Sequence, residues 1–202
     1  MQKNLVFFSG PHGSGKSTLI DILLKEIPNA ISPELKTKTS KFQTEPKERQ
    51  IMKTCQRSIE NYEYLEIAIR NPEKIILGNR CIYDVIAYNE TYHSRKWIPK
   101  DELAKNNRFA KECFIEELNK PYAIILNPDL EIVKLHLEKR WKEKEKKWNE
   151  NDMDYLKAAC ESYGMFKNNE RIFYISKEIN LDNTFEIKKI VDWIVQGKNG
   201  EK

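Results

Sequence analysis

The sequence predicts an α/β fold in which helices cover a parallel sheet. Short apolar runs alternate with longer stretches of helical periodicity, and the runs are continuous, as buried parallel strands require. A glycine-rich loop joins the first run to the first helix. At 202 residues the chain has the length of one domain with a small appended element, so we expect one active centre.

The expected strands are short apolar segments. The first of them is too short for a signal-peptide core or a membrane span and leads directly into glycines. Two others, at 75–77 and 123–126, consist of consecutive apolar residues that are typical of central strands. In chain order the expected strands are Leu5–Ser9, Ala30–Ser32, Lys74–Leu77, Tyr122–Leu126 and Arg171–Ile175.

The expected helices show apolar residues three and four positions apart. This spacing is clearest between 45 and 70, where it includes Ile51, Cys55, Ile59 and Tyr62. The expected helices are Lys16–Glu26, Glu45–Arg70, Ile82–His93, Lys100–Asn119, Leu130–Lys147, Met153–Phe166 and Asn183–Gln196. Residues 1–196 should form a single domain, followed by a disordered tail, Gly197–Lys202.

Composition and charge exclude several classes of protein. The chain has 40% hydrophobic residues, enough for a sizeable core, which excludes a mainly disordered protein. A net charge of +4 falls short of the basic face of a dedicated nucleic-acid binder. The four cysteines are far apart without a C-x-x-C pair and indicate neither a disulfide framework nor a zinc site. We expect a cytoplasmic protein with no membrane segment and no nucleic-acid partner.

The most informative motif follows the first expected strand. It matches G-x-x-x-x-G-K-[ST] and reads Gly10-Pro11-His12-Gly13-Ser14-Gly15-Lys16-Ser17. Glycines let the backbone wrap a polyphosphate and deliver it to a helix N-terminus, where free N–H groups favour negative charge. We therefore expect this loop to bind ATP. Lys16 would reach the β- and γ-phosphates, Ser17 would bind Mg²⁺, and Thr18 would donate to an earlier phosphate.

A phosphate-binding loop does not identify the reaction, because many activities share it. The sequence contains no N-K-x-D tetrapeptide, the guanine reader of GTPases. It also lacks a long apolar strand that ends in Asp-Glu, where motor ATPases place their metal and water-activating pair. The sequence therefore favours neither a GTPase nor a motor ATPase.

The segment after the third expected strand distinguishes the remaining classes. Gly78-Asn79-Arg80 is followed by Asp84 and by Ala87-Tyr88-Asn89. This spacing resembles the P-loop nucleoside and nucleotide kinases, above all thymidylate kinases, whose third strand ends in D-R-Y-x-x-S-x-x-A-Y-Q. Deoxynucleoside kinases have a comparable E-R-S segment, and nicotinamide-riboside-kinase-like proteins have D-R-x-x-x-D-x-x-A-Y.

The resemblance implies a three-layer P-loop kinase fold with a five-stranded parallel sheet in the order 2-3-1-4-5 and helices on both faces. It implies transfer of the γ-phosphoryl group of ATP, with Mg²⁺, to a nucleoside monophosphate or nucleoside, a thymidylate-like acceptor being favoured. The small-molecule substrate would be the main partner. Since thymidylate kinases pair as dimers, the resemblance also raises the prospect of a homodimer.

The resemblance also assigns roles to single residues. Arg80, at a strand end, would clamp the acceptor phosphate or the transferred group, and Glu34 would accept a proton from a hydroxyl acceptor. Arg140 would act from a basic lid at about 138–152, which includes Lys142 and Lys144. The remaining acceptor-pocket residues are Gln56, Arg57, Tyr62, Asp84, Tyr88 and Asn89. The structural alternatives are an Arg80–Asp84 ion pair, core packing by Tyr88 and an exposed loop carboxylate at Glu34.

Three departures separate the chain from these families. Asn79 stands where they have an acid that helps hold the Mg²⁺ hydration shell, His136 where a first lid arginine is expected, and Asp84 in place of the thymidylate-kinase serine. Asp84 favours a nicotinamide-riboside-type acceptor as an alternative. Asn79 favours a degenerate module that binds ATP without transferring phosphate. A polynucleotide kinase is a third alternative, which the small net charge supports weakly.

Overall fold

The sheet is parallel throughout and has the predicted order. The computed structural model describes residues 4–37, 45–143, 149–180 and 183–199. Five strands are hydrogen-bonded in the order β2-β3-β1-β4-β5, which confirms the fold class and the strand order. They are β1 (Leu5–Ser9), β2 (Ala30–Ile31), β3 (Ile75–Asn79), β4 (Tyr122–Leu126) and β5 (Ile172–Ile175).

Helices make the crossovers that parallel neighbours need. They are α1 (Lys16–Glu26), α2 (Pro46–Arg70), α3 (Ile82–Ser94), α4 (Lys100–Cys113), α5 (Glu116–Asn119), α6 (Leu130–Trp141), α7 (Met153–Tyr163) and α8 (Thr184–Asn199). A 3₁₀ turn, Gly164–Phe166, extends α7. No helix in the described part of the chain is long and apolar enough to cross a membrane.

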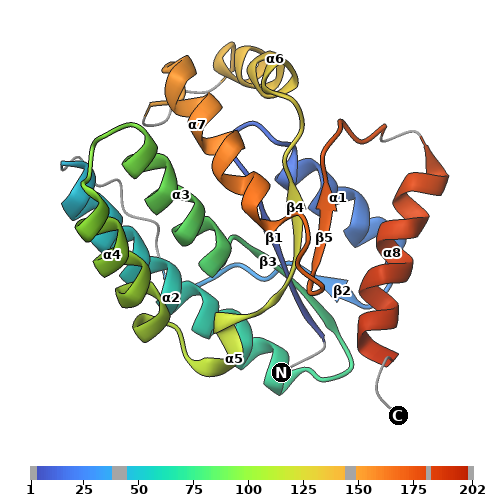
Figure 1. Ribbon diagram of the computed structural model, residues 1–202. Helices are drawn as coiled ribbons and strands as arrows, with labels where there is room; N and C mark the ends of the chain where they lie inside the picture. The colour runs from blue at the N-terminus through green and yellow to red at the C-terminus, as the bar shows by residue number, and fades with distance from the viewer. Residues whose placement is uncertain (1–3, 38–44, 144–148, 181–182, 200–202) are drawn as a thin grey trace.

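The helices form two layers, one on each face of the sheet, and alternate residues of each strand supply the two cores. In β1, Leu5 and Phe7 pack in the core beneath α2, α3, α4 and α5. Val6 and Phe8 pack in the opposite core with α1 and α8. Figure 1 shows α2, α3 and α4 on one side of the sheet and α1 and α8 on the other. The three-layer prediction is therefore confirmed.

Several predicted boundaries are shifted by one or two residues, and three segments differ more from the prediction. The helix expected over Lys100–Asn119 is interrupted at Phe114, which is extended and 2% exposed in the core, while Asn119 Nδ2 donates to the Phe114 carbonyl at 2.9 Å. The helix expected to reach Lys147 ends at Trp141, and residues 144–148 lie outside the described part. The tail expected to be disordered is helical through Asn199, and residues 200–202 lie outside the described part.

The sheet order places the functional residues at one edge. In the parallel register Phe8 of β1 pairs with Asn79 of β3, and Arg80 N donates to the Phe8 carbonyl at 2.9 Å. The chain therefore leaves β1 and β3 side by side at their carboxyl ends. Because β3 and β4 flank β1 on opposite sides, this edge is the topological switch point at which open α/β sheets bind ligands.

Candidate nucleotide-binding site

The loop between β1 and α1 has the backbone that its glycines predict. Gly10 has φ +140°, and a Cβ there would lie 2.1 Å from the Leu126 carbonyl oxygen. Gly13 has φ +76°, and Gly15 forms the N-cap of α1. The first helical hydrogen bond runs from Leu19 N to Gly15 O at 3.0 Å. The N–H groups of the three preceding residues therefore have no partner within the helix and can receive an anion.

Lys16 directs its ammonium group back over this loop. Its Nζ donates to Gly10 O at 2.9 Å, to Pro11 O at 2.7 Å and to Ser14 Oγ at 3.0 Å. The residue is only 9% exposed. The cation is thus held at the centre of the loop, where the motif places the β- and γ-phosphates of a nucleotide.

The residues at the start of α1 fit a phosphate-bound Mg²⁺. Ser17 and Thr18 follow Lys16 and are both solvent-exposed, so their hydroxyl groups are accessible to an oxygen-liganded cation. The side chain of Asn79, at the end of β3, is also exposed. Among the described residues, no three His, Cys, Asp or Glu side chains form a metal cluster. Mg²⁺ would depend mainly on Ser17 and on the phosphates.

Arg80 and Asp84 form a buried ion pair beside the loop. Arg80 has φ +67°, an uncommon conformation for a non-glycine residue. Its Nη1 donates to Asp84 Oδ1 at 2.7 Å and to Gly10 O at 3.4 Å. The predicted alternative for Arg80, an ion pair with Asp84, is therefore present. The same guanidinium group also reaches the phosphate-binding loop.

Asp84 is surrounded by protein donors. Its Oδ2 accepts from Ser9 Oγ at 2.6 Å and from Cys81 N at 2.9 Å, and its Oδ1 accepts from Tyr163 Oη at 2.5 Å as well as from Arg80. Burial favours the protonated acid, but the charges of Arg80 and Lys16 and these hydrogen bonds hold the pKa of Asp84 below its ordinary value. Asp84 is therefore ionised near neutral pH, where its charge holds the Arg80 guanidinium group.

Tyr88 lies beneath the Arg80 guanidinium group. The Arg80 Cζ is 5.5 Å from the ring centroid, and Tyr88 Oη is 3.5 Å from Arg80 Nη1. The Tyr88 ring is stacked against Tyr155 at 6.3 Å and lies 5.8 Å from His12. Burial raises the pKa of Tyr88, so its hydroxyl stays protonated near neutral pH. Tyr88 packs as the core alternative predicts and also forms part of the Arg80 cluster.

Helix α6 packs directly on the phosphate-binding loop. A Cβ on Gly13 would lie 2.8 Å from Leu137 Cγ and 2.9 Å from the Val133 carbonyl oxygen. His136, which precedes Leu137 in α6, also contacts the loop. Its Nδ1 is 2.9 Å from Gly13 O, and its Nε2 is 3.1 Å from Glu178 Oε1. The residue that replaces an expected lid arginine therefore contacts the loop backbone.

Glu150 connects the predicted lid to the loop. Arg140 Nη2 forms an ion pair with Glu150 Oε2, to which Trp141 Nε1 donates at 3.4 Å. The other carboxylate oxygen lies 3.1 Å from His12 Nδ1. Glu150 has no exposed surface. Burial lowers the pKa of His12 to about 4, although Glu150 favours its charged form. His12 is therefore neutral near pH 7.

The other predicted site residues are dispersed. Gln56 is buried on the inner face of α2, where it accepts from Lys53 at 3.0 Å and donates to Glu60 at 2.8 Å. Glu34 is exposed on the chain that follows β2. Asn89 is fully buried and donates to Asn107 of α4 at 2.8 Å, and so it joins two helices.

Tyr62 is 49% exposed on the outer face of α2 and does not line a pocket with Gln56. Lys144 and Trp148 of the predicted lid lie outside the described residues.

Sequence reasoning missed Ser9, Tyr163 and Glu150. None of them belongs to a motif, and their partners are distant in sequence: Tyr163 meets Asp84 across 79 positions.

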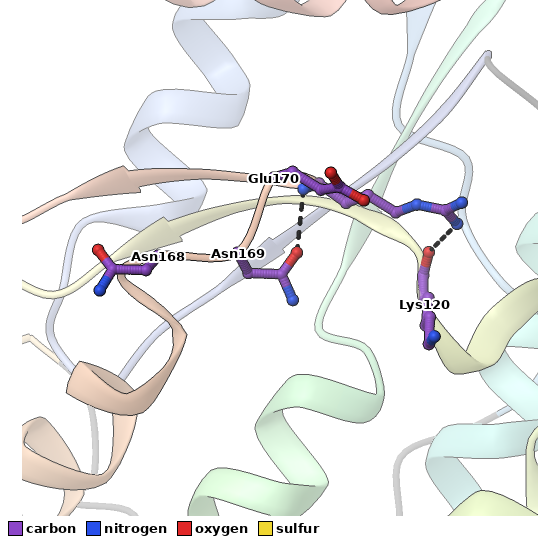
Figure 2. A pocket seen from close by; sticks show the side chains of 5 residues that line it. Lys120, Asn168, Asn169 and Glu170 are labelled. Atoms are coloured by element: carbon purple, nitrogen blue, oxygen red, sulfur yellow. Dashed lines mark hydrogen bonds between the residues drawn. The ribbon is translucent and has the colours of Figure 1, made fainter.

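A separate hollow of about 380 Å³ lies at the amino ends of β4 and β5 and is lined by Lys120, Asn168, Asn169, Glu170 and Arg171 (Figure 2). Arg171 Nη1 donates to the Lys120 carbonyl there at 2.9 Å. This hollow lies at the opposite end of the sheet from the phosphate-binding loop.

The sheet order, the loop and its lysine together define a P-loop nucleotide-binding protein of the kinase-like α/β class. A family model described as an AAA domain matches residues 5–150, and the chain belongs to this family. A comparison with curated proteins gives no match.

Solved structures of kinases share the fold over nearly the whole chain. Deoxyadenosine kinase from M. mycoides, solved with bound dATP, has a TM-score of 0.65 at 14% identity and covers 94% of this chain and 98% of its own. Thymidylate kinase from Candida albicans has a TM-score of 0.64 at 15% identity, and the match covers 98% of this chain and 93% of the thymidylate kinase chain. The resemblance to nucleoside and nucleotide kinases is therefore confirmed for the fold.

Proposed function

We propose that this protein is an ATP-dependent kinase that transfers the γ-phosphoryl group to a nucleoside monophosphate or a nucleoside. The observation that carries the proposal is the convergence of two cations on Gly10. Lys16 Nζ lies 2.9 Å and Arg80 Nη1 lies 3.4 Å from the same carbonyl oxygen. Phosphoryl transfer requires mainly that the protein position two substrates and neutralise the moving anion, and two cations at one sheet edge suit that task.

Each group in the site has a role in this reaction. The loop amides and Lys16 bind the ATP phosphates, and Ser17 holds Mg²⁺, which supplies charge neutralisation at the phosphates when it is bound. Arg80, fixed by Asp84, directs its remaining donors to the transferred group or the acceptor. Arg140 closes the site from the segment that follows α6, where it helps to exclude water.

Structural likeness to kinases that act on deoxynucleosides and on thymidylate supports a nucleoside or nucleotide acceptor. The nicotinamide-riboside-type alternative depends on Asp84. That carboxylate accepts four hydrogen bonds from the protein, which fill its acceptor capacity. We therefore favour the nucleoside and nucleotide acceptors.

The test is acceptor-dependent release of ADP. Purified protein is incubated with ATP and Mg²⁺ and with a panel of nucleosides and 5′-monophosphates, and ADP is measured by a coupled assay. We expect turnover with at least one acceptor and a loss of about 100-fold or more in the Lys16→Ala variant, because the lysine neutralises charge that develops in transfer. ADP release that is independent of every acceptor, or none at all, would contradict the proposal.

A non-catalytic ATP-binding module is the second candidate, and Asn79 favours it. The Asn79 amide occupies the position of an acid that would help hold the Mg²⁺ hydration shell, and Asp84, a buried acid in the helix that follows, is committed to Arg80. Replacement Asn79→Asp distinguishes the two candidates. A large gain in transfer indicates a weakened kinase, whereas tight ATP binding without transfer in either form indicates the binding module.

The cytoplasmic location, the absence of a nucleic-acid partner and the homodimer stay predictions. For the homodimer the relevant surface is the outer face of α2, where Met52, Ile59, Tyr62 and Ile69 are each at least 40% exposed. Sedimentation over a range of protein concentrations tests it.

A further inference from the structure

The inner face of α2 carries a row of basic side chains. Arg49, Lys53 and Arg57 are four positions apart, a spacing that places them above one another on one face of a helix. All three are partly buried. Met52 and Ile59, on the outer face of the same helix, are exposed. Between Arg49 and Ile59 the helix therefore turns three cations towards the protein and leaves two apolar side chains in solvent, the reverse of ordinary amphipathicity.

Contacts at both ends place this row between the end of β3 and α3. Arg57 Nη1 donates to the Asn79 carbonyl at the end of β3 at 3.0 Å. Arg49 forms a hydrogen bond with the Tyr92 side chain of α3. Lys53 lies between them and donates to Gln56 Oε1 at 3.0 Å. The row thus spans from the end of β3, next to Arg80, to α3.

Three cations, Arg49, Arg57 and Arg80, and one acid, Glu60, act on the charge of Lys53. Arg57 pairs with Glu60 at 2.5 Å, and Glu60 also accepts from Gln56. Burial, together with the charges of Arg49 and Arg57, lowers the pKa of Lys53 to about 8, and Arg80 acts in the same direction. Like charges gathered at partly buried positions repel one another, and an anion that binds among them relieves this repulsion.

We infer that Arg49, Lys53 and Arg57 form a second anion site, which binds the phosphate group of a phosphorylated acceptor opposite the phosphate-binding loop. This inference rests on the proposed kinase function and selects between its two acceptor classes. A phosphate acceptor needs no general base, since it is already anionic. Glu34, the base that a hydroxyl acceptor would require, is exposed on the chain that follows β2.

Affinities of matched ligands test the row directly. Calorimetry is performed with 5′-monophosphates of adenosine, guanosine, cytidine and thymidine and with the four corresponding nucleosides. We expect at least one monophosphate to bind about tenfold or more tightly than its nucleoside, because each charge-assisted hydrogen bond contributes about 1.5–3 kcal/mol. Inorganic phosphate should compete with that monophosphate.

Two variants and a matched control isolate the row. Lys53→Gln and Arg49→Gln should each weaken the monophosphate about tenfold while the affinities for the nucleoside and for ATP stay unchanged. Arg70→Gln removes the same charge from an exposed position of α2, where the side chain is 73% exposed, and should change none of these affinities. Unchanged ATP affinity shows that each variant is folded.

The outcomes separate this inference from the kinase proposal. Equal binding of monophosphates and nucleosides, unchanged monophosphate affinity in both row variants, or no binding of any probe overturns the anion site. ADP release with nucleosides but with no monophosphate also overturns the anion site, while it supports the kinase proposal. Tight monophosphate binding that depends on the row, without ADP release, supports the anion site and contradicts the kinase proposal.

Discussion

Replacement of Asp84 by asparagine tests the buried ion pair. The side chains of Asp84 and Arg80 are 4% and 16% exposed, and Asp84 accepts hydrogen bonds from Arg80, Tyr163, Ser9 and Cys81 N. Asparagine keeps the size of the side chain but removes the charge and turns one accepting oxygen into an NH₂ donor that faces other donors. Arg80 is then left partly buried without its anion.

The expected loss is that of a broken buried pair, about 3–5 kcal/mol in the free energy of unfolding. For a chain of this length that corresponds to a fall in Tm of about 6–20 °C. Urea unfolding followed by circular dichroism measures the first quantity, and a thermal scan measures the second. Asp101→Asn serves as the control, because Asp101 is 70% exposed and its Lys105 partner lies 3.5 Å away. It should change stability by less than about 0.5 kcal/mol.

A double-mutant cycle extends this test to Tyr163. The Tyr163→Phe variant removes the hydroxyl that donates to Asp84 Oδ1. Its effect should shrink when Asp84 is already asparagine, because the two groups share one network. A loss below about 1 kcal/mol for Asp84→Asn, or strict additivity in the cycle, would refute the claim that this carboxylate fixes Arg80.

Three further predictions concern the loop. Lys16→Ala should weaken ATP binding by at least about tenfold in calorimetry, and an unchanged Kd would contradict the role of the lysine. Gly13→Ala should destabilise the fold by about 1–3 kcal/mol in urea unfolding, because its Cβ would meet Leu137 and Val133 at φ +76°. The folded pKa of His12, about 4, lies below the ordinary 6.5, so stability should fall as pH drops from 6.5 towards 4. Unfolding of His12→Asn at several pH values should show a smaller dependence in that window, and an identical pH profile would argue against a buried neutral His12.

Features encoded by contiguous residues were predictable from the sequence. The strand, loop and helix around Lys16 occupy one short segment, and Arg80 follows an apolar run directly, so both positions could be assigned from local pattern. The break at Phe114 could not, because apolar periodicity continues through it and only burial of the side chain in the core favours the extended backbone. The end of α6 is likewise set by tertiary contacts of Arg140 and Trp141 with Glu150.

Side-chain direction limited the site predictions on helices. Gln56 and Tyr62 are six positions apart on α2, which places them on different faces of the helix, so they could not line the same pocket. Asn89 follows Tyr88 immediately, yet it faces α4 while Tyr88 faces Arg80. Glu150 carried no motif, and its contact with His12 joins residues far apart in the sequence, although its other partners, Arg140 and Trp141, are close to it in the chain.

The contact between Gly13 and α6 has a mechanical consequence. Because Leu137 and the Val133 carbonyl press against a glycine of the phosphate-binding loop, the first two turns of α6 and that loop form one stiff block. Arg140 follows this contact in α6, so a movement of Arg140 relative to the loop would require the helix to bend after Leu137.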